Sequence, residues 1–79
     1  MDIKVLGSGC EKCTALYDNT CKALEKLGIQ AEVEKVEDLL EIVLFGVMNV
    51  PALMVGGKIV LSGRTASVAE IEKLLKKQQ

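Results

Sequence analysis

Apolar and polar residues change their spacing along this chain, and the changes divide its first half into three predicted elements. Residues 3–6 form a short apolar-rich run closed by the glycines of residues 7–9, which predicts a buried strand. Residues 10–27 carry apolar side chains at helical spacing, and Gly28 ends that predicted helix. Its expected buried face consists of Cys13, Leu16, Thr20, Ala23, Leu24 and Leu27. Residues 29–36 form the next segment, in which apolar and polar residues alternate strictly from Ile29 to Glu34, and this predicts a half-exposed strand.

The second half begins with an acidic pair, Glu37 and Asp38, which suits the positive end of a helix running to about residue 45. Two apolar runs follow, at residues 52–55 and 58–61, and they are separated by two glycines. This arrangement is the strongest hairpin signal in the chain.

A final helix is predicted from Ser67 to about residue 77, with lysines in its last turns. Glu70 stands three residues after Ser67, which is the spacing of a capping box. Ala66 and Ile71 are placed to close the same helix end with an apolar contact.

The predicted order β-α-β-α-β-β-α indicates an α/β fold with one domain over residues 1–79. The first two strands are joined through a helix and should be parallel, whereas the last two should form an antiparallel hairpin. We therefore expect a four-stranded mixed sheet with helices on both faces. The apolar character of both hairpin strands predicts that each is covered on both faces.

The composition of the chain limits the partners, the catalytic mechanisms and the cellular compartment that we expect for this protein. The 79 residues carry a formal net charge of -1, which gives no electrostatic reason to expect nucleic acid or an anionic membrane as partner. The N-terminal residues lack a signal-peptide pattern, and no apolar run approaches the ~20 residues of a membrane span. Histidine is absent, which excludes Ser-His-Asp and Cys-His catalysis. The three cysteines are an odd number, which fits a reducing compartment, and we expect a cytoplasmic protein.

Cys10 and Cys13 stand where the first strand passes into the first helix. Unpaired peptide N–H groups at a helix start favour a thiolate, and the cation of Lys12 adds to this effect. We expect Cys10 to be the exposed attacking thiol and Cys13 the buried resolving thiol. A structural zinc half-site is disfavoured, because three cysteines without histidine do not supply four ligands. The C-x-x-C pair in this context therefore predicts thiol–disulfide redox chemistry without a metal or other cofactor.

Several spaced motifs match a known family in order. They are residues 7–13 (GSGCEKC), 46–53 (GVMNVPAL), 57–58 (GK) and 62–64 (SGR). By these motifs the chain resembles the small thioredoxin-like proteins of the redox-active disulfide family over essentially its whole length. The resemblance implies a minimal thioredoxin-like fold and a thiol–disulfide oxidoreductase that reduces disulfides of proteins or small molecules. Its electron donor would be an upstream reductase or glutathione.

The resemblance also assigns roles to residues outside the cysteine pair. From its position alone, Pro51 is interpreted as a residue at the start of a strand. The resemblance implies instead that the Val50–Pro51 bond is cis and that its loop faces Cys10. Val50 would then offer its backbone to a bound substrate strand. The buried acid that assists the resolving thiol in longer thioredoxins would fall near Lys4.

Three further expectations concern the rest of the chain. Cys21 is about 12 Å along the helix from Cys13, too far for a disulfide, and is interpreted as a half-buried structural cysteine. The apolar residues around Leu44 and Phe45 span a wider arc of the predicted helix than one sheet face can bury, so we expect an exposed apolar patch there. We expect the protein to be a monomer or a weak homodimer. A carrier of soft metals or metalloids and a thioredoxin-like adaptor are the alternative functions.

Overall fold

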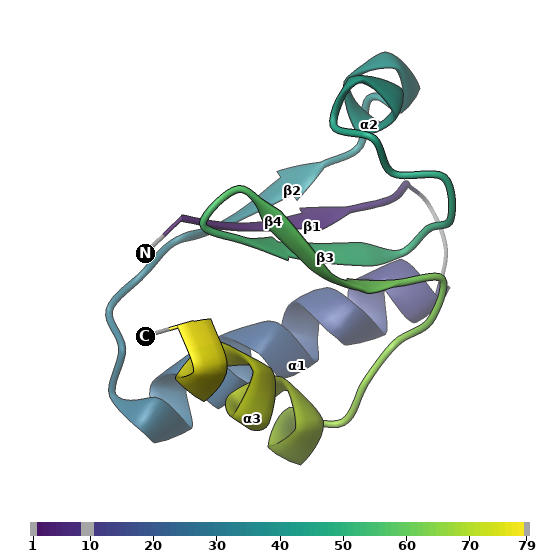
Figure 1. Cartoon of the computed structure of the whole chain (residues 1–79). Helices are drawn as coiled ribbons and strands as arrows, with labels where there is room; N and C mark the ends of the chain where they lie inside the picture. Colours follow the sequence, from purple (N-terminus) through teal and green to yellow (C-terminus); the bar gives the residue numbers. More distant parts are fainter. Residues whose placement is uncertain (1, 9–10, 79) are drawn as a thin grey trace.

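The computed structural model of the chain describes residues 2–8 and 11–78. Within these residues the chain forms strands β1–β4 and helices α1–α3 in the order β-α-β-α-β-β-α (Figure 1), as the sequence predicts. The elements are β1 (Ile3–Leu6), α1 (Glu11–Leu27), β2 (Val33–Val36), α2 (Leu39–Leu44), β3 (Ala52–Val55), β4 (Lys58–Ser62) and α3 (Val68–Gln78). None of the described helices is long and apolar enough to cross a membrane.

The strands form a mixed sheet in the order β2-β1-β3-β4. β1 pairs with β2 in parallel, with Ile3 opposite Val33 and Leu6 opposite Val36. β3 pairs antiparallel with both β1 and β4, and a bulge interrupts the β3–β4 ladder between Leu53 and Met54. The predicted parallel pair and hairpin are therefore both confirmed. β1 and β3 are the two inner strands. Because they are antiparallel and Leu6 lies opposite Ala52, the residues that follow β1 and those that precede β3 meet at one end of the sheet.

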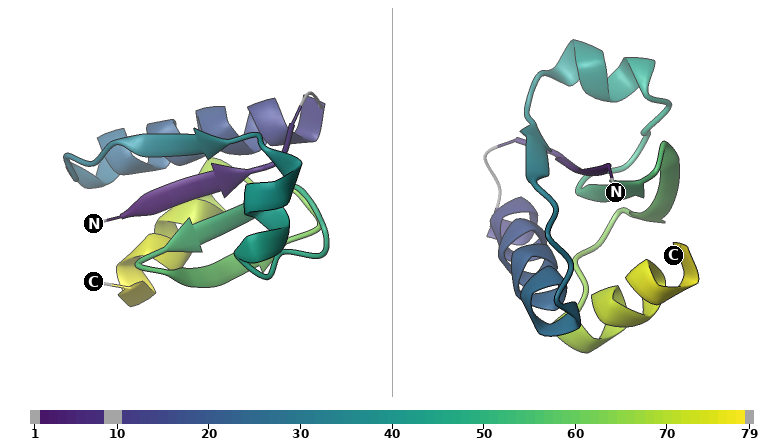
Figure 2. Two further views of the ribbon diagram at one scale, coloured as in Figure 1. Left: turned by 90° about the horizontal axis from the view of Figure 1, so that it is seen from above. Right: turned by 90° about the vertical axis from the view of Figure 1, so that its left-hand side faces the viewer.

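Helices α1 and α3 pack together on one face of the sheet (Figures 1 and 2). The main core lies there, and α1 contributes to the buried surface the face that its apolar spacing predicts. Successive strand residues alternate between the two faces, so Ile3 and Val5 of β1 point into this core. The core residues are Ile3, Val5, Leu16, Ala23, Leu24, Leu53, Val55, Leu61, Ala66, Ile71 and Leu75.

Helix α2 lies on the opposite face of the sheet (Figure 2). Asp38 caps its start, because the carboxylate accepts a 2.9 Å hydrogen bond from the Leu40 backbone N–H. Ile42 is the buried residue of this helix, and it joins a smaller cluster that also contains Val47 and sheet residues of β1, β2 and β3. Helices therefore cover both faces of the sheet, as predicted, but unequally.

Two strand predictions need correction. The ladder of β2 begins at Val33 instead of residue 29, because the register with β1 starts at the Ile3–Val33 pair. Ile29 and Ala31 instead pack against the main core from an irregular segment, which preserves their predicted alternation of burial. β4 is the second departure: its first two residues are exposed, since β4 is an edge strand that α2 does not cover. β3 is buried along its whole length, as predicted.

The start of α3 confirms half of the predicted capping box. The Glu70 backbone N–H donates a 3.2 Å hydrogen bond to the Ser67 hydroxyl. The Glu70 carboxylate turns instead to Arg64 and accepts two hydrogen bonds from its guanidinium group. Charge-assisted pairing of this bidentate kind lowers the pKa of Glu70 below its ordinary value. Ala66 and Ile71 are both buried in the main core, as the apolar-closure prediction requires.

Candidate functional site

Cys13 lies in the first turn of α1, and it is 4% exposed. Of the two cysteines that the structure describes, Cys13 is disulfide-bonded and Cys21 carries a free thiol. The burial expected for Cys13 is confirmed. Cys10, which the sequence predicts to be the exposed attacking thiol, lies outside the described residues, and so does Gly9.

Gly7 lies close to the Cys13 side chain. This glycine directly follows β1, has a backbone φ of +148°, and donates its N–H to the Val36 carbonyl oxygen at 2.9 Å. A Cβ atom at this position would stand 2.5 Å from the Cys13 Sγ atom and 3.5 Å from the Pro51 Cα atom. Any side chain larger than hydrogen would therefore displace the sulfur, the backbone or both.

Pro51 also lies close to Gly7. The Val50–Pro51 peptide bond is cis, as expected, and the Pro51 ring is fully buried. The Pro51 carbonyl oxygen accepts a 2.9 Å hydrogen bond from the Gly63 N–H, which ties the start of β3 to the end of β4. Gly63 also fits closely against Asn49, because a Cβ on Gly63 would stand 3.3 Å from the Asn49 Cβ atom. The residue after β1, the first turn of α1 and the start of β3 therefore lie close together at one end of the sheet.

The residues around this point differ in their exposure. Lys12 is exposed in the first turn of α1, and Val50 is 47% exposed immediately before the buried proline. Lys4 lies on the sheet face opposite α1, with its ammonium group 5.7 Å from the centre of the Phe45 ring. Its hydrogen bond to the Asp2 carboxylate raises the pKa of Lys4.

Val50 also borders an apolar groove between α2 and the loop that follows it. The lining residues are Leu39, Ile42, Val43, Gly46, Val47, Met48 and Val50. Leu44 is 80% exposed and Phe45 40% exposed, so the expected exposure of apolar side chains on and after this helix is confirmed. The groove ends at the residue that precedes Pro51.

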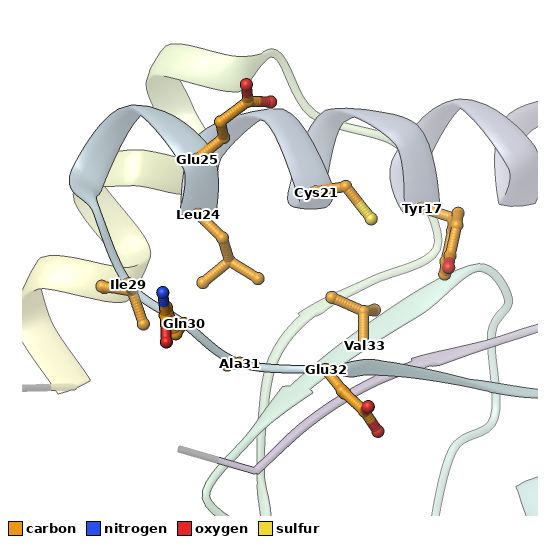
Figure 3. A pocket seen from close by; sticks show the side chains of 9 residues that line it. All are labelled: Tyr17, Cys21, Leu24, Glu25, Ile29, Gln30, Ala31, Glu32 and Val33. Carbon is orange, nitrogen blue, oxygen red and sulfur yellow. The ribbon is translucent and has the colours of Figure 1, made fainter.

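A second pocket lies between α1 and the irregular segment before β2 (Figure 3). Cys21 and Tyr17 point into it from α1, and Cys21 is half-buried, as predicted. The electrostatic influence of the neighbouring Cys21 side chain raises the pKa of Tyr17 above its ordinary value. The ammonium group of Lys35 lies 4.9 Å from the centre of the Tyr17 ring.

Gly7 is the residue that sequence reasoning missed, because it was interpreted as part of a turn. A glycine between a predicted strand and a cysteine pair carries a weak signal of close approach. The second neighbour of Gly7, Pro51, is brought to it by the pairing of β1 with β3, which no local sequence signal encodes.

Comparison with known proteins gives consistent matches over nearly the whole chain. A family described as thioredoxin domain matches residues 1–76. A protein named thioredoxin from Methanothermobacter thermautotrophicus is 40% identical over 75 residues, which cover 95% of this chain and 97% of that protein. Another protein named thioredoxin, from Methanocaldococcus jannaschii, is 43% identical over 74 residues, covering 94% of this chain and 85% of that protein.

Proposed function

The chain belongs to the thioredoxin family, and from that premise we propose that Cys10 and Cys13 form a redox pair that reduces disulfides of proteins or small molecules. A thioredoxin-like redox function and the thiol–disulfide oxidoreductase class follow from the family. The residue roles and the substrate class are the proposal.

The main observation that supports this proposal is the burial of Cys13. A disulfide-bonded cysteine in the first turn of a helix, packed against Gly7 and close to Pro51, is shielded from a large substrate. Such shielding suits a resolving thiol, which reacts with its neighbour and not with the substrate. The backbone N–H groups at the start of α1 favour the thiolate form on which both steps depend.

The proposed reaction consists of two exchanges. The Cys10 thiolate attacks one sulfur of the substrate disulfide, forming a mixed disulfide and releasing the other substrate sulfur as a thiolate that takes up a proton. Cys13 then loses its proton, and its thiolate attacks the Cys10 sulfur. This second exchange releases the remaining substrate thiol and leaves a Cys10–Cys13 disulfide. The substrate gains two electrons and two protons, and the protein loses them.

Exposed residues beside the pair have proposed supporting roles. The Lys12 ammonium would stabilise the attacking thiolate. Val50 would pair its backbone with an extended substrate segment, with Pro51 fixing the position of that segment next to the sulfur. The partial exposure of Val50 and the packing of Pro51 near Gly7 support these roles.

The cycle requires an electron donor, which we propose to be an upstream reductase or glutathione. The odd number of cysteines supports a reducing compartment such as the cytoplasm. We further propose that residues 1–79 act as one thioredoxin-like domain.

Trapping experiments test the assignment of the two cysteines. Cys13→Ser should accumulate mixed disulfides with an insulin-derived disulfide peptide, because the second exchange is blocked. Cys10→Ser should abolish reduction of the same peptide. Cys21→Ser is the matched control and should retain wild-type turnover, since its thiol lies in the pocket of Figure 3. Faster alkylation of Cys13 than of Cys10 at neutral pH would contradict the proposed order.

A redox titration tests the chemistry independently of any substrate. The Cys10–Cys13 pair should titrate as one two-electron couple with a midpoint between roughly −300 and −180 mV. A midpoint far below this range would indicate a structural disulfide instead.

A further inference from the structure

The surface of α2 and of the loop after it is apolar and unusually exposed. Leu40 and Leu44 form a crest one helical turn apart, and they are 71% and 80% exposed. Beside the crest runs the groove already described, whose exposed margins are Leu39, Val43, Met48 and Val50. We call these six residues together the α2 patch.

The size of the α2 patch matches an interface between proteins. From the exposed fractions of its residues, the uncovered area is roughly 700 Å², close to the ~800 Å² that each partner buries in a standard-size complex. The largest apolar patch on a typical monomer is about 300–600 Å². The patch is therefore about as large as the largest apolar patches that isolated chains leave in water.

The residues that line and surround the α2 patch indicate which class of partner could bind there. Within the described part of the chain, every residue that lines the groove is apolar or glycine, whereas small-molecule sites add a few convergent polar groups. Glu37, Asp38 and Glu41 are exposed beside the patch, and their charges oppose adsorption to an anionic membrane. An apolar protein surface remains as the matching partner.

The crest and the groove are complementary to one another. A substrate strand extended beside Val50 would occupy the groove and leave Leu40 and Leu44 in water, because these two residues lie outside the groove lining. A second copy of the chain, related by a two-fold axis, would cover both features at once, since each crest would enter the partner's groove. Such pairing uses the same residues on each copy and buries the whole patch.

We propose that the α2 patch is a self-association surface, on which the crest of one copy occupies the groove of another. The dimer covers Val50 on both copies. The dimer therefore makes the proposed substrate-binding backbone of Val50 inaccessible, and dissociation makes it accessible again. This consequence rests on the proposed function of Val50, whereas the dimer itself does not.

Sedimentation equilibrium of the full chain up to about 1 mM tests the dimer. We expect wild-type self-association, and at least an about tenfold weaker association for Leu40→Glu/Leu44→Glu, because the carboxylates would have to be buried. Met48→Lys is a single-residue test in the loop, should the double variant fail to fold. Ile59→Glu is the matched control: it removes an exposed apolar residue of β4, outside the patch, and should dimerise like wild type.

The outcomes separate the alternatives. Wild-type chains that stay monomeric at about 1 mM, or variants that dimerise like wild type, overturn the proposal. Monomeric wild type combined with selective loss of protein-disulfide reduction in the double variant would assign the patch to a different protein and also overturn it. If the dimer forms, activity per chain toward a protein disulfide should fall as wild-type concentration rises, but not in the double variant. Dimerisation without any disulfide reduction would reject the proposed function alone.

Discussion

The two faces of the sheet are built differently. On one face, α1 and α3 enclose the main core, and residues such as Leu16 and Ile71 are fully buried. On the other face, the single short helix α2 contributes Ile42 to a smaller cluster and leaves four of its own apolar residues exposed. The first face accounts for most of the burial of apolar surface that stabilises a chain of this size.

This difference predicts on which face substitutions should change stability and on which face they should change binding to a partner. A buried side chain is constrained by its neighbours, so its replacement changes stability first. An exposed apolar side chain has few neighbours in its own chain, so its replacement should change binding more than stability. The candidate site lies at the end of the sheet where these two faces meet, next to Pro51.

The largest expected effect compares the same substitution on the two faces. Leu16→Ala should lower the free energy of unfolding by ~2–5 kcal/mol, because it leaves a cavity in the main core. Leu44→Ala should change it by no more than about 0.5 kcal/mol, because that side chain is exposed. Urea denaturation followed by circular dichroism measures both. Equal losses for the two variants would show that α2 is as much a part of the core as α1.

The next effect concerns the point where the faces meet. Gly7→Ala should destabilise the fold by ~1–3 kcal/mol through overpacking and an unfavourable φ. It should also raise the reduction potential, because the added methyl group clashes with the sulfur of the disulfide-bonded Cys13. Titration against a glutathione buffer measures the potential.

Gly28→Ala provides the matched control for Gly7→Ala. Gly28 also has a positive φ, of +69°, but a Cβ there meets no atom within 4 Å. This variant should lose stability through backbone strain while leaving the reduction potential unchanged. A similar potential shift in both variants would mean that the Gly7 effect is not local to the sulfur.

A smaller effect is expected at the start of α2. Asp38→Ala should lower stability by about 1 kcal/mol, since the Leu40 N–H loses its capping acceptor. Hydrogen exchange should accelerate in residues 39–44 while protection in α1 is retained, because the two helices lie on opposite faces. Asp38→Asn, which keeps a capping oxygen, should retain most of the protection. Uniform acceleration through both helices would indicate one cooperative unit.

The smallest effect is the pH dependence of the Arg64–Glu70 pair at the start of α3. The folded-state pKa of Glu70 is lowered by Arg64, so the pair contributes stability above the unfolded-state pKa of ~4.3 and loses it as pH falls through the folded value. Arg64→Gln should therefore be slightly less stable than wild type at pH 7. The difference should vanish in acid, as measured by thermal unfolding at several pH values. A difference that grows in acid would contradict this linkage.

The sequence predicts the element order well because each element carries a local signal. Gly56 and Gly57 between two apolar runs require a turn, and Ser67 with Glu70 marks a helix start. The apolar spacing of residues 10–27 identifies the buried face of α1 for the same reason. The burial of Cys13 follows from its place on that face.

Long-range geometry accounts for the departures. The length of β2 depends on the register with β1, and the exposure of β4 depends on how far α2 extends over the sheet. Neither quantity is encoded within the segment concerned. The close approach of Pro51 to Gly7 depends on the pairing of β3 with β1, and these two residues are more than forty positions apart in the sequence.

The central position of β1 has a consequence for folding. The hairpin of β3 and β4 is local, but β3 joins β1 across about fifty residues of chain, and contacts of such separation form late. Pro51 reaches Gly7 after this pairing is made. Before this pairing forms, the cysteines of the proposed redox pair should therefore react as ordinary thiols, because Pro51 is not yet in place beside Gly7.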